Sequence, residues 1–536
     1  MKILFPLLIT MSTSALHAAD YGKAIDAYEK FVATEIKDWE LGGVAVAWVD
    51  DQSIVFEAGF GEAKSDSVFR AGSVSKLLNA VAVMQLVEKD KLDLDAALPA
   101  NRLPVNPFSD ELLTLRHLLC HRSGMQREST VGGYFDASEP TLEATVASLK
   151  GSALVSPPNT ESRYSNIAPS LAGQFAAEAA GVPFPKLQAD GIMKPLGMSR
   201  SAWLRKDAPE VIPSHIRVAD GKGGYVTRST PLFDLGTIPA GNLYTTAGDL
   251  GRFLMMLAAG GNSPGGRILK KETLEEMWKP QLDPKGAFGV GFALGEWQGH
   301  KTVGHGGAVY GHSTALTYLP DKKIGVVVLV NDDIVNGRSQ ALANAALNLM
   351  LQAKGEKPKL VTTKPVGEKA KALAGAWESQ SFWLDLTAEG ENVKGNYSGQ
   401  SCTISRGEDN GLLLNSRIHD NQPLTVERDD QGTVTALLAG PQRFTRVPEK
   451  RQVPAEWKKL MGSYGPGLIP LVIHEKQGRL YATTENMVDY RLTPVNPHVF
   501  AFPPGLYLKE HAVFITDDAG NPTAVELATM RLQRIK

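Results

Sequence analysis

Residues 69–76 read Phe-Arg-Ala-Gly-Ser-Val-Ser-Lys and contain the one Ser-x-x-Lys pair of the chain, Ser73 and Lys76. Gly72 precedes the serine, and the apolar pattern that follows, to about residue 89, predicts a helix with Ser73 in its first turn. Residues three apart share a helix face, so the amine can reach the hydroxyl. A serine becomes a nucleophile when a base lies at hydrogen-bond distance, and burial and the helix N-terminus lower the pKa of a lysine that serves as that base. For an isolated match, a serine N-cap followed by a solvated lysine is the alternative.

The sequence around this helix predicts one sheet that is built from both ends of a domain. Four short apolar runs form two pairs, each joined by polar turn residues, and each pair predicts a hairpin: residues 44–49 with 54–58, and residues 314–319 with 324–330. Helical spacing appears in residues 21–39 and again from Ser339 onward. We therefore expect an α/β (α+β) domain over residues 20–355, with helices on the faces of the sheet.

The pattern changes beyond this domain. Residues 356–369 are rich in Lys, Pro, Glu and Thr, which is typical of a linker. Short strand-like segments separated by Gly, Asp, Asn and Pro then predict one or two all-β, lipocalin-like barrel domains. Two similar openings, at residues 373–377 and 460–464, favour two related domains over residues 370–449 and 450–536.

The N-terminus indicates an exported protein, and the charge distribution argues against two classes of partner. The net charge is −2, with Lys and Arg scattered along the chain, which argues against nucleic acid or an anionic membrane surface as a partner. A cationic residue, a short apolar run and small residues predict a signal peptide over residues 1–19, cleaved near Ala18 or Ala19, and hence a periplasmic or secreted protein. No later run is long enough for a transmembrane segment. Cys120 and Cys402 fall in different predicted domains, so no disulfide framework is implied.

Two further motifs can carry chemistry, although each is weak alone. Tyr164 and Asn166 belong to the one Tyr-x-Asn of the chain, which offers a phenol for proton transfer and an amide for orientation. Residues 304–308 read Gly-His-Gly-Gly-Ala, where glycines let a substrate backbone approach and the Ala308 N–H can join that of Ser73 in an oxyanion hole. A buried tyrosine and a glycine-rich turn are the alternatives. His117, Cys120 and His121 have metal-ligand spacing, but we expect no metal and no cofactor.

Taken together, the motifs resemble the class C β-lactamase-like family, which includes penicillin-binding proteins, D-aminopeptidases, D-peptidases and esterases of the S12 peptidase group. The resemblance covers about residues 24–351 and rests on the order of five stretches, at residues 69–76, 116–124, 164–166, 239–243 and 304–307. It implies that Ser73 is the acylated nucleophile, that Lys76 accepts its proton and that Tyr164 is the partner acid or base. It also implies substrate-binding positions at Asn166, His305, Gly307 and Ala308.

The resemblance departs from the β-lactamases at His305, where those enzymes usually have the lysine of a Lys-Thr-Gly motif. Imidazole is mostly neutral at pH 7 and is a weaker anchor for a carboxylate. The layout of a hydrolase domain followed by β-barrels is similar to the D-aminopeptidase branch, in which a loop of a C-terminal barrel reaches toward the active site. This implies a D-aminopeptidase or D-peptidase activity on small peptides, amides or esters. Asp489 is one candidate partner for a substrate amine.

Two alternatives stay open at this point. One is a promiscuous esterase or weak β-lactamase of the same fold, and the other is a penicillin-binding sensor or scaffold with poor turnover. The expected partner is a small molecule or short peptide, and the oligomeric state is open. If little apolar surface is shared with the tail, a chain ending near residue 351 should remain soluble and still react with a small ester.

Overall fold

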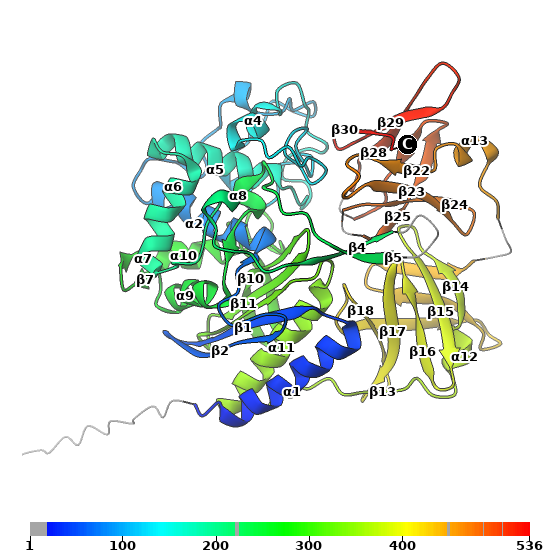
Figure 1. Cartoon of the computed structure of the whole chain (residues 1–536), viewed down its shortest axis with the longest axis horizontal. Helices are drawn as coiled ribbons and strands as arrows, with labels where there is room; N and C mark the ends of the chain where they lie inside the picture. Colours follow the sequence, from blue (N-terminus) through cyan, green and yellow to red (C-terminus); the bar gives the residue numbers. More distant parts are fainter. Residues whose placement is uncertain (1–18, 220–224, 448–450, 486, 506, 536) are drawn as a thin grey trace, which may run out of the picture.

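The computed structural model describes residues 19–219, 225–447, 451–485, 487–505 and 507–535 (Figure 1). The predicted signal peptide lies outside these residues except for Ala19. None of the helices in the described part of the chain has the length and apolar character needed to cross a membrane.

One six-stranded antiparallel sheet organises the first domain, with strand order β2-β1-β12-β11-β10-β9. Both predicted hairpins are present, as β1 (Gly43–Asp50) with β2 (Ser53–Gly61) and as β11 (His312–Leu319) with β12 (Ile324–Val330). Strand β1 pairs with β12, so the two ends of the domain meet in the middle of the sheet. The remaining strands are β9 (Ala293–Trp297) and β10 (His300–Val309). The predicted α/β architecture is confirmed.

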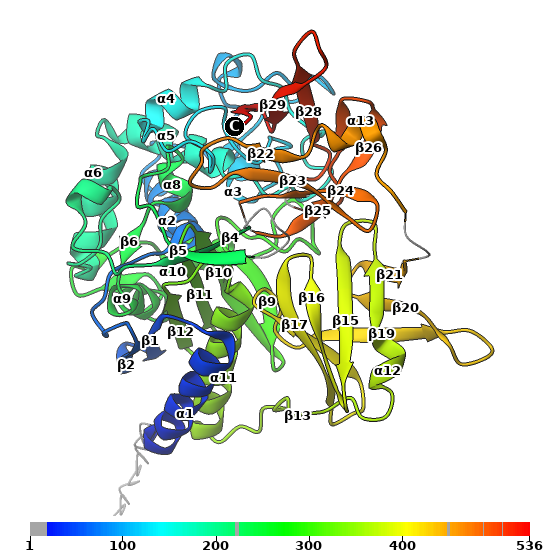
Figure 2. The same cartoon turned by 45° about the vertical axis from the view of Figure 1, so that its right-hand side comes forward.

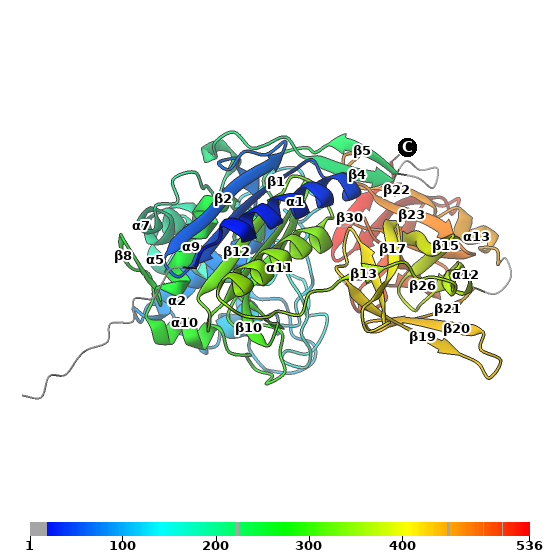
Figure 3. The same cartoon turned by 90° about the horizontal axis from the view of Figure 1, so that it is seen from below.

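The two faces of β1 are covered by different helices, because successive side chains of a strand point to opposite sides. Val44, Val46 and Trp48 pack in the cluster formed with α1 (Gly22–Trp39) and α11 (Asn336–Ala353). Ala45, Ala47 and Val49 pack instead with α2 (Ser75–Val87) and α9 (Ala247–Ala258). Figure 3 shows α1 and α11 side by side on one face of the sheet. All of these β1 side chains are fully buried, which makes the sheet the core of the domain.

Short elements complete this domain. The helices are α3 (Leu115–Leu119), α4 (Leu142–Ala147), α5 (Ile167–Ala180), α6 (Phe184–Gln188), α7 (Lys194–Leu196), α8 (Ile238–Gly241) and α10 (Lys271–Met277). Three small hairpins or strand pairs are β3 (Phe69–Arg70) with β6 (Tyr244–Thr245), β4 (His215–Ala219) with β5 (Tyr225–Ser229), and β7 (Asn262–Ser263) with β8 (Gly266–Arg267). A 3₁₀ turn, Gly72–Val74, leads into α2.

A closed eight-stranded barrel follows, which confirms the predicted all-β tail. Its strands are β14 (Gly375–Glu378), β15 (Trp383–Glu389), β16 (Asn392–Tyr397), β17 (Gln400–Gly407), β18 (Leu412–Ser416), β19 (Gln422–Arg428), β20 (Val434–Ala439) and β21 (Gln442–Arg446). The pairings β14–β21 and β17–β18 close the ring. Before it lie β13 (Thr363–Lys364), which pairs with β17, and helix α12 (Ala370–Leu373), so the segment predicted as a linker touches the barrel.

The last module consists of two smaller sheets after helix α13 (Ala455–Lys458). One sheet contains β22 (Gly462–Tyr464), β23 (Leu471–Lys476), β24 (Arg479–Thr483) and β25 (Asp489–Arg491). The other contains β26 (Thr493–Asn496), β27 (Val499–Ala501), β28 (His511–Thr516), β29 (Pro522–Leu527) and β30 (Met530–Gln533). An isolated bridge between Tyr464 and Arg534 connects them. Figure 2 shows this module in orange and red above the yellow barrel.

The last module shares its apolar core with the first domain. Eight buried side chains of the first domain belong to the cluster that fills the module: Tyr134, Phe135, Ile216, Phe233, Leu235, Val309, Tyr310 and Ile334. Tyr310 lies 5.2 Å from Tyr134, measured between ring centroids. The first domain and the last module therefore share a large apolar surface. A chain ending near residue 351 is expected to remain soluble only if this surface is small, and that condition is not met.

Candidate active site

The turn before α2 lies directly against β10, and two glycines permit this approach. Gly72 has φ +53, and a Cβ there would lie 2.8 Å from the Ala308 nitrogen. A Cβ on Gly307 would lie 2.1 Å from the Ala71 carbonyl oxygen. Neither position can hold a side chain without moving the backbone, so the glycines bring the N-terminus of α2 against the strand that carries Ala308.

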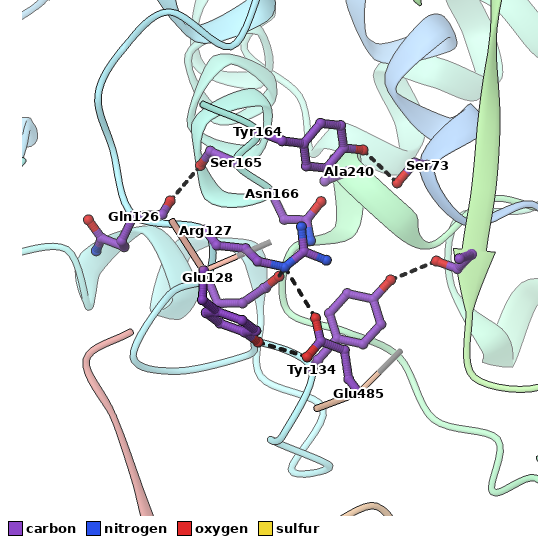
Figure 4. Close-up of polar contacts among 12 residues, drawn as sticks. Ser73, Gln126, Arg127, Glu128, Tyr134, Tyr164, Ser165, Asn166, Ala240 and Glu485 are labelled. Atoms are coloured by element: carbon purple, nitrogen blue, oxygen red, sulfur yellow. Dashed lines mark hydrogen bonds and ion pairs between the residues drawn. The ribbon is translucent and has the colours of Figure 1, made fainter. Parts of the chain in front are cut away.

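Three predicted side chains meet at this point, as Figure 4 shows in part. Lys76 Nζ lies 2.9 Å from Ser73 Oγ, one helical turn away. Tyr164, just before α5, donates its hydroxyl to Ser73 Oγ at 2.8 Å. The serine is half-buried, whereas Lys76 is 2 % exposed. Two ionisable groups thus flank one reachable hydroxyl.

The contacts of Lys76 fit a neutral amine. In addition to its contact with Ser73 Oγ, Nζ donates to Asn166 Oδ1 at 2.8 Å and to the Ala240 carbonyl at 2.9 Å. Both of these oxygens can only accept, so they take two N–H groups and leave the nitrogen lone pair for the serine hydroxyl proton. Burial lowers the pKa of Lys76 well below its usual value, and the Arg127 cation lowers it further. The lysine can therefore act as a proton acceptor.

Burial favours the neutral form of Tyr164 as well, but the neutral form of a phenol carries its proton. Burial raises its pKa to about 12, so the phenol keeps its proton at neutral pH. The His121 ring stacks on it with a centroid distance of 4.2 Å, and burial holds the pKa of His121 well below its usual value. A neutral imidazole places no cation against the phenol. At neutral pH Lys76 is a neutral amine with a free lone pair, and Tyr164 is a phenol that has kept its proton. Lys76 can therefore take a proton and Tyr164 can give one.

His305 lies on β10 beside this group and is 8 % exposed. Its Nδ1 lies 2.5 Å from the Gly306 carbonyl oxygen, which can only accept, and this assigns the ring proton to Nδ1. Nε2 is buried, has no hydrogen-bond partner among the residues that the structure describes, and carries the lone pair. Burial, together with the nearby Lys76, lowers the pKa of His305 to about 4. The position is therefore uncharged at neutral pH and offers an acceptor.

The structure also brings together residues that the sequence does not single out. Glu128 accepts the Asn166 amide N–H at 2.6 Å, and Arg127 is the residue immediately before Glu128 in the chain. Arg127 Nε lies 3.1 Å from Oε1 of Glu485, a residue of the loop between β24 and β25 in the last module. Tyr134 donates its hydroxyl to the Ala308 carbonyl at 2.6 Å. No spacing pattern marks these residues, because they are joined only by the fold of distant segments.

Asp489 lies outside this group. Its Oδ2 accepts from Trp383 Nε1 at 2.8 Å, and its Oδ1 lies 3.0 Å from His474 Nε2 and 2.5 Å from Thr483 Oγ1. The carboxylate is 1 % exposed, and these contacts join the barrel to the last module. It is occupied by structural contacts, whereas Glu485, four residues earlier, reaches the first domain.

The fold and the comparisons define a class: the protein is a serine hydrolase of the fold shared by β-lactamases and penicillin-binding proteins. The family model described as Beta-lactamase matches residues 29–349, more than half of the chain, and the chain belongs to this family. Penicillin-binding protein 4 of Amycolatopsis lactamdurans is 27% identical over 329 residues, which is 57% of this chain and 84% of that protein. The D-alanyl-D-alanine-carboxypeptidase/endopeptidase AmpH of Escherichia coli K12 is 26% identical over 349 residues, 60% of this chain and 86% of that protein.

Solved structures share the fold at lower identity. The octameric penicillin-binding protein homologue from Pyrococcus abyssi superimposes with a TM-score of 0.56 at 22% identity, covering 87% of this chain and 99% of that one. The D-amino acid amidase from Ochrobactrum anthropi SV3 gives a TM-score of 0.53 at 22% identity, covering 62% of this chain and 100% of that one. These likenesses show the fold.

Proposed function

We propose that Ser73 is the nucleophile of an acyl-enzyme mechanism. Neutral Lys76 takes the Ser73 proton as Oγ attacks the substrate carbonyl, and the N–H groups of Ser73 and Ala308 stabilise the oxyanion. The Tyr164 hydroxyl gives its proton to the leaving group, whose bond to the carbonyl carbon then breaks. In the second half of the reaction the Tyr164 phenolate takes a proton from the water that attacks the acyl carbon, and Lys76 returns its proton to Ser73 Oγ as the bond from Oγ to the acyl carbon breaks. This releases the acyl group as an acid and restores neutral Lys76 and protonated Tyr164.

The substrate class that we propose is small peptides, amides or esters without a carboxylate next to the scissile bond, in a D-aminopeptidase or D-peptidase type of activity. The uncharged His305 carries this proposal, because it offers a lone pair where a cation would be needed to hold a carboxylate. The D-amino acid amidase and the D-stereospecific amidohydrolase from Streptomyces, the latter at a TM-score of 0.51, support it through the D-amino acid substrates after which they are named. The apolar N-terminal run supports export to the periplasm or the medium.

A comparison of three substrates tests the substrate class. We expect kcat/KM for D-alanyl p-nitroanilide to exceed that for D-alanyl-D-alanine, which has a free carboxylate, and that for a cephalosporin, by at least about tenfold, or ~1.4 kcal/mol. His305→Lys should reduce this preference by about tenfold because it adds a cation, whereas the neutral control His305→Gln should keep it. A wild-type preference for the free carboxylate would overturn the substrate class.

Labelling with a fluorophosphonate tests the nucleophile separately. Ser73→Ala should abolish labelling and hydrolysis with an unchanged circular dichroism spectrum. Lys76→Ala and Tyr164→Phe should each slow acylation by roughly two to four orders of magnitude, and their losses should not add, because both serve one proton path. Labelling of the alanine variant at the wild-type rate would place the nucleophile elsewhere.

A further inference from the structure

Glu128 touches the candidate active site through one amide. Its Oε1 accepts from Asn166 Nδ2 at 2.6 Å, while the other end of that amide, Oδ1, accepts from Lys76 Nζ at 2.8 Å. A carboxamide has donors at one end and an acceptor at the other. A carboxylate that accepts from the NH₂ end therefore holds the oxygen end toward Lys76. If the amide were reversed, its N–H groups would face the lysine and the lysine would lose an acceptor.

The orientation depends on the charge of Glu128, and Arg127, the cation that favours this charge, is held by a carboxylate of another domain. Glu485 itself raises the pKa of Glu128, so it supports the charge only through Arg127. Glu128 is fully buried, and Arg127 Nε lies 3.6 Å from its Oε1. The same Nε lies 3.1 Å from Glu485 Oε1 of the last module, and Tyr507 donates its hydroxyl to Glu485 Oε2 at 2.8 Å. Figure 4 shows Arg127 and Glu128 on the far side of Asn166 from Tyr164 and Ser73, with Glu485 next to Arg127. The last module thus supplies the carboxylate that holds the guanidinium in place.

This support matters because an isolated buried carboxylate protonates. Burial raises the pKa of Glu128 to about 7, against the lowering effect of Arg127. A protonated carboxyl can turn its O–H toward the amide and no longer requires the NH₂ end there. The titratable and charged groups that face Glu128 across this space are Arg127, Glu485, Lys76, Tyr134, Tyr164, Tyr310 and Tyr507. Arg127 is the group among them that stabilises the ionised form most directly.

We propose that Glu128 is a positioning residue, which fixes the Asn166 amide with its oxygen toward Lys76, and that Glu485 of the last module holds Arg127 beside it. The proposal rests on the proposed roles of Ser73 and Lys76. It makes the last module a contributor to the rate of the reaction, through the chain of contacts from Glu485 to Arg127, Glu128, Asn166 and Lys76. Neither carboxylate touches the reacting atoms.

The first test compares two substitutions of Glu128 in the full-length protein, with p-nitrophenyl acetate as substrate. Glu128→Leu removes the acceptor and should lower kcat by roughly 10–100-fold with little change in KM, since misplaced catalytic groups cost rates of this order. Glu128→Gln keeps one oxygen acceptor of the same shape, but it can also turn its own NH₂ end toward Asn166, so it should lower kcat by a smaller factor of about two- to fivefold. Equal losses in the two variants, or an effect on KM alone, would overturn the proposal.

A second test covers the case in which Glu128→Leu fails to fold, as judged by circular dichroism. Glu485→Gln should lower kcat by about three- to tenfold in the wild-type background and by less than twofold in an Asn166→Ala background, because the effect passes through that amide. The matched control is Glu378→Gln, which alters a buried carboxylate where the barrel meets the last module, paired with Arg479 at 3.0 Å, and should leave kcat unchanged. Equal losses in the two backgrounds, or an equal loss in the control, would overturn the proposal.

The outcome also separates this proposal from the proposed mechanism. If the wild-type protein is not labelled by a fluorophosphonate at Ser73, the mechanism fails. If it is labelled and turns over the ester, but the Glu128 and Glu485 variants keep the full rate, only the positioning roles fail.

Discussion

The two β-modules begin in the same way. Trp377 Nε1 donates to the Leu373 carbonyl at 2.9 Å, and Tyr464 Oη donates to the Leu460 carbonyl at 2.7 Å, four residues back in each case. A later arginine lies over each ring: Arg446 at the end of β21 is 4.2 Å from the Trp377 centroid, and Arg534, just after β30, is 6.0 Å from the Tyr464 centroid. The similarity of residues 373–377 and 460–464 therefore reflects one structural motif that is used twice.

The modules differ in where they contact the first domain. The barrel contacts α1 and α11, away from Ser73: Arg417 donates to the Trp39 carbonyl at 2.9 Å, and Arg338 donates to the His419 carbonyl at 2.5 Å. The last module instead pairs Glu485 with Arg127, next to Asn166. Similar modules thus have different consequences: we expect changes at the barrel contact to alter stability, and changes at the contact of the last module to alter chemistry as well.

Removal of the last module should have the largest effect. A chain ending near residue 447 would uncover the eight apolar side chains of the first domain that pack in the module, and it would remove Glu485 from Arg127 and Glu510 from Arg163. Newly exposed apolar surface favours aggregation, and Arg127 would lose the carboxylate that positions it, so we expect insoluble protein or a loss of at least ~100-fold in acylation rate. Soluble yield, circular dichroism and p-nitrophenyl acetate turnover measure this. A folded, fully active short chain would show that the module is dispensable.

The sequence predicts the elements of this fold better than their contacts. Both hairpins, the first helix and the helix after Ser73 follow from local apolar spacing, and the structure has them within a few residues. The shared core was not predictable, because Tyr134 and Phe135 lie in a loop without periodicity and meet strands more than 300 residues away. A local pattern shows that a segment has an apolar face, but it does not show which distant segment packs against that face.

The same limit applies to the site. Ser73, Lys76 and Tyr164 stand in recognisable motifs, and their side chains lie together as the resemblance implies. Glu485 belongs to no motif. Asp489 is a candidate carboxylate by its place in the second β-module, but it accepts a hydrogen bond from Trp383 and pairs with His474. Only the turn between β24 and β25 decides which of two acidic residues four positions apart faces the first domain.

A pair of arginine substitutions should sharpen the difference between the two contacts. In Arg127→Gln the cation that lowers the pKa of Lys76 is lost, and Glu128 and Glu485 remain, so the pKa of Lys76 should rise. Less lysine is then neutral at a given pH, and the acidic limb of the kcat/KM profile should move to higher pH by roughly one unit. Arg417→Gln, at the barrel contact, should leave the profile in place and lower stability by about 1–3 kcal/mol.

The measurements are the pH profile of p-nitrophenyl acetate hydrolysis and urea denaturation of both variants. A shift of the acidic limb to lower pH in Arg127→Gln would contradict the electrostatic role of that cation. A shift in Arg417→Gln would show that the barrel also influences the chemistry, and the distinction between the modules would fail.

The smallest effect is expected where the two modules touch each other, at His474 and Asp489. Burial lowers the pKa of His474, but the Asp489 carboxylate raises it by more, so the pKa of His474 in the folded protein lies above its usual value. Burial raises the pKa of Asp489, but its contact with His474 lowers it by more, so the pKa of Asp489 lies below its usual value. The contribution of His474 to stability is complete below its unfolded pKa of about 6.5 and is lost as the pH rises through the folded value. The contribution of Asp489 is present above about pH 4 and is lost as the pH falls through its own folded value.

Stability should therefore fall between about pH 5.5 and pH 8 by less than ~1 kcal/mol, and His474→Gln should flatten this change without altering kcat. Urea denaturation at the two pH values measures it, and an unchanged slope in the variant would remove His474 as its source.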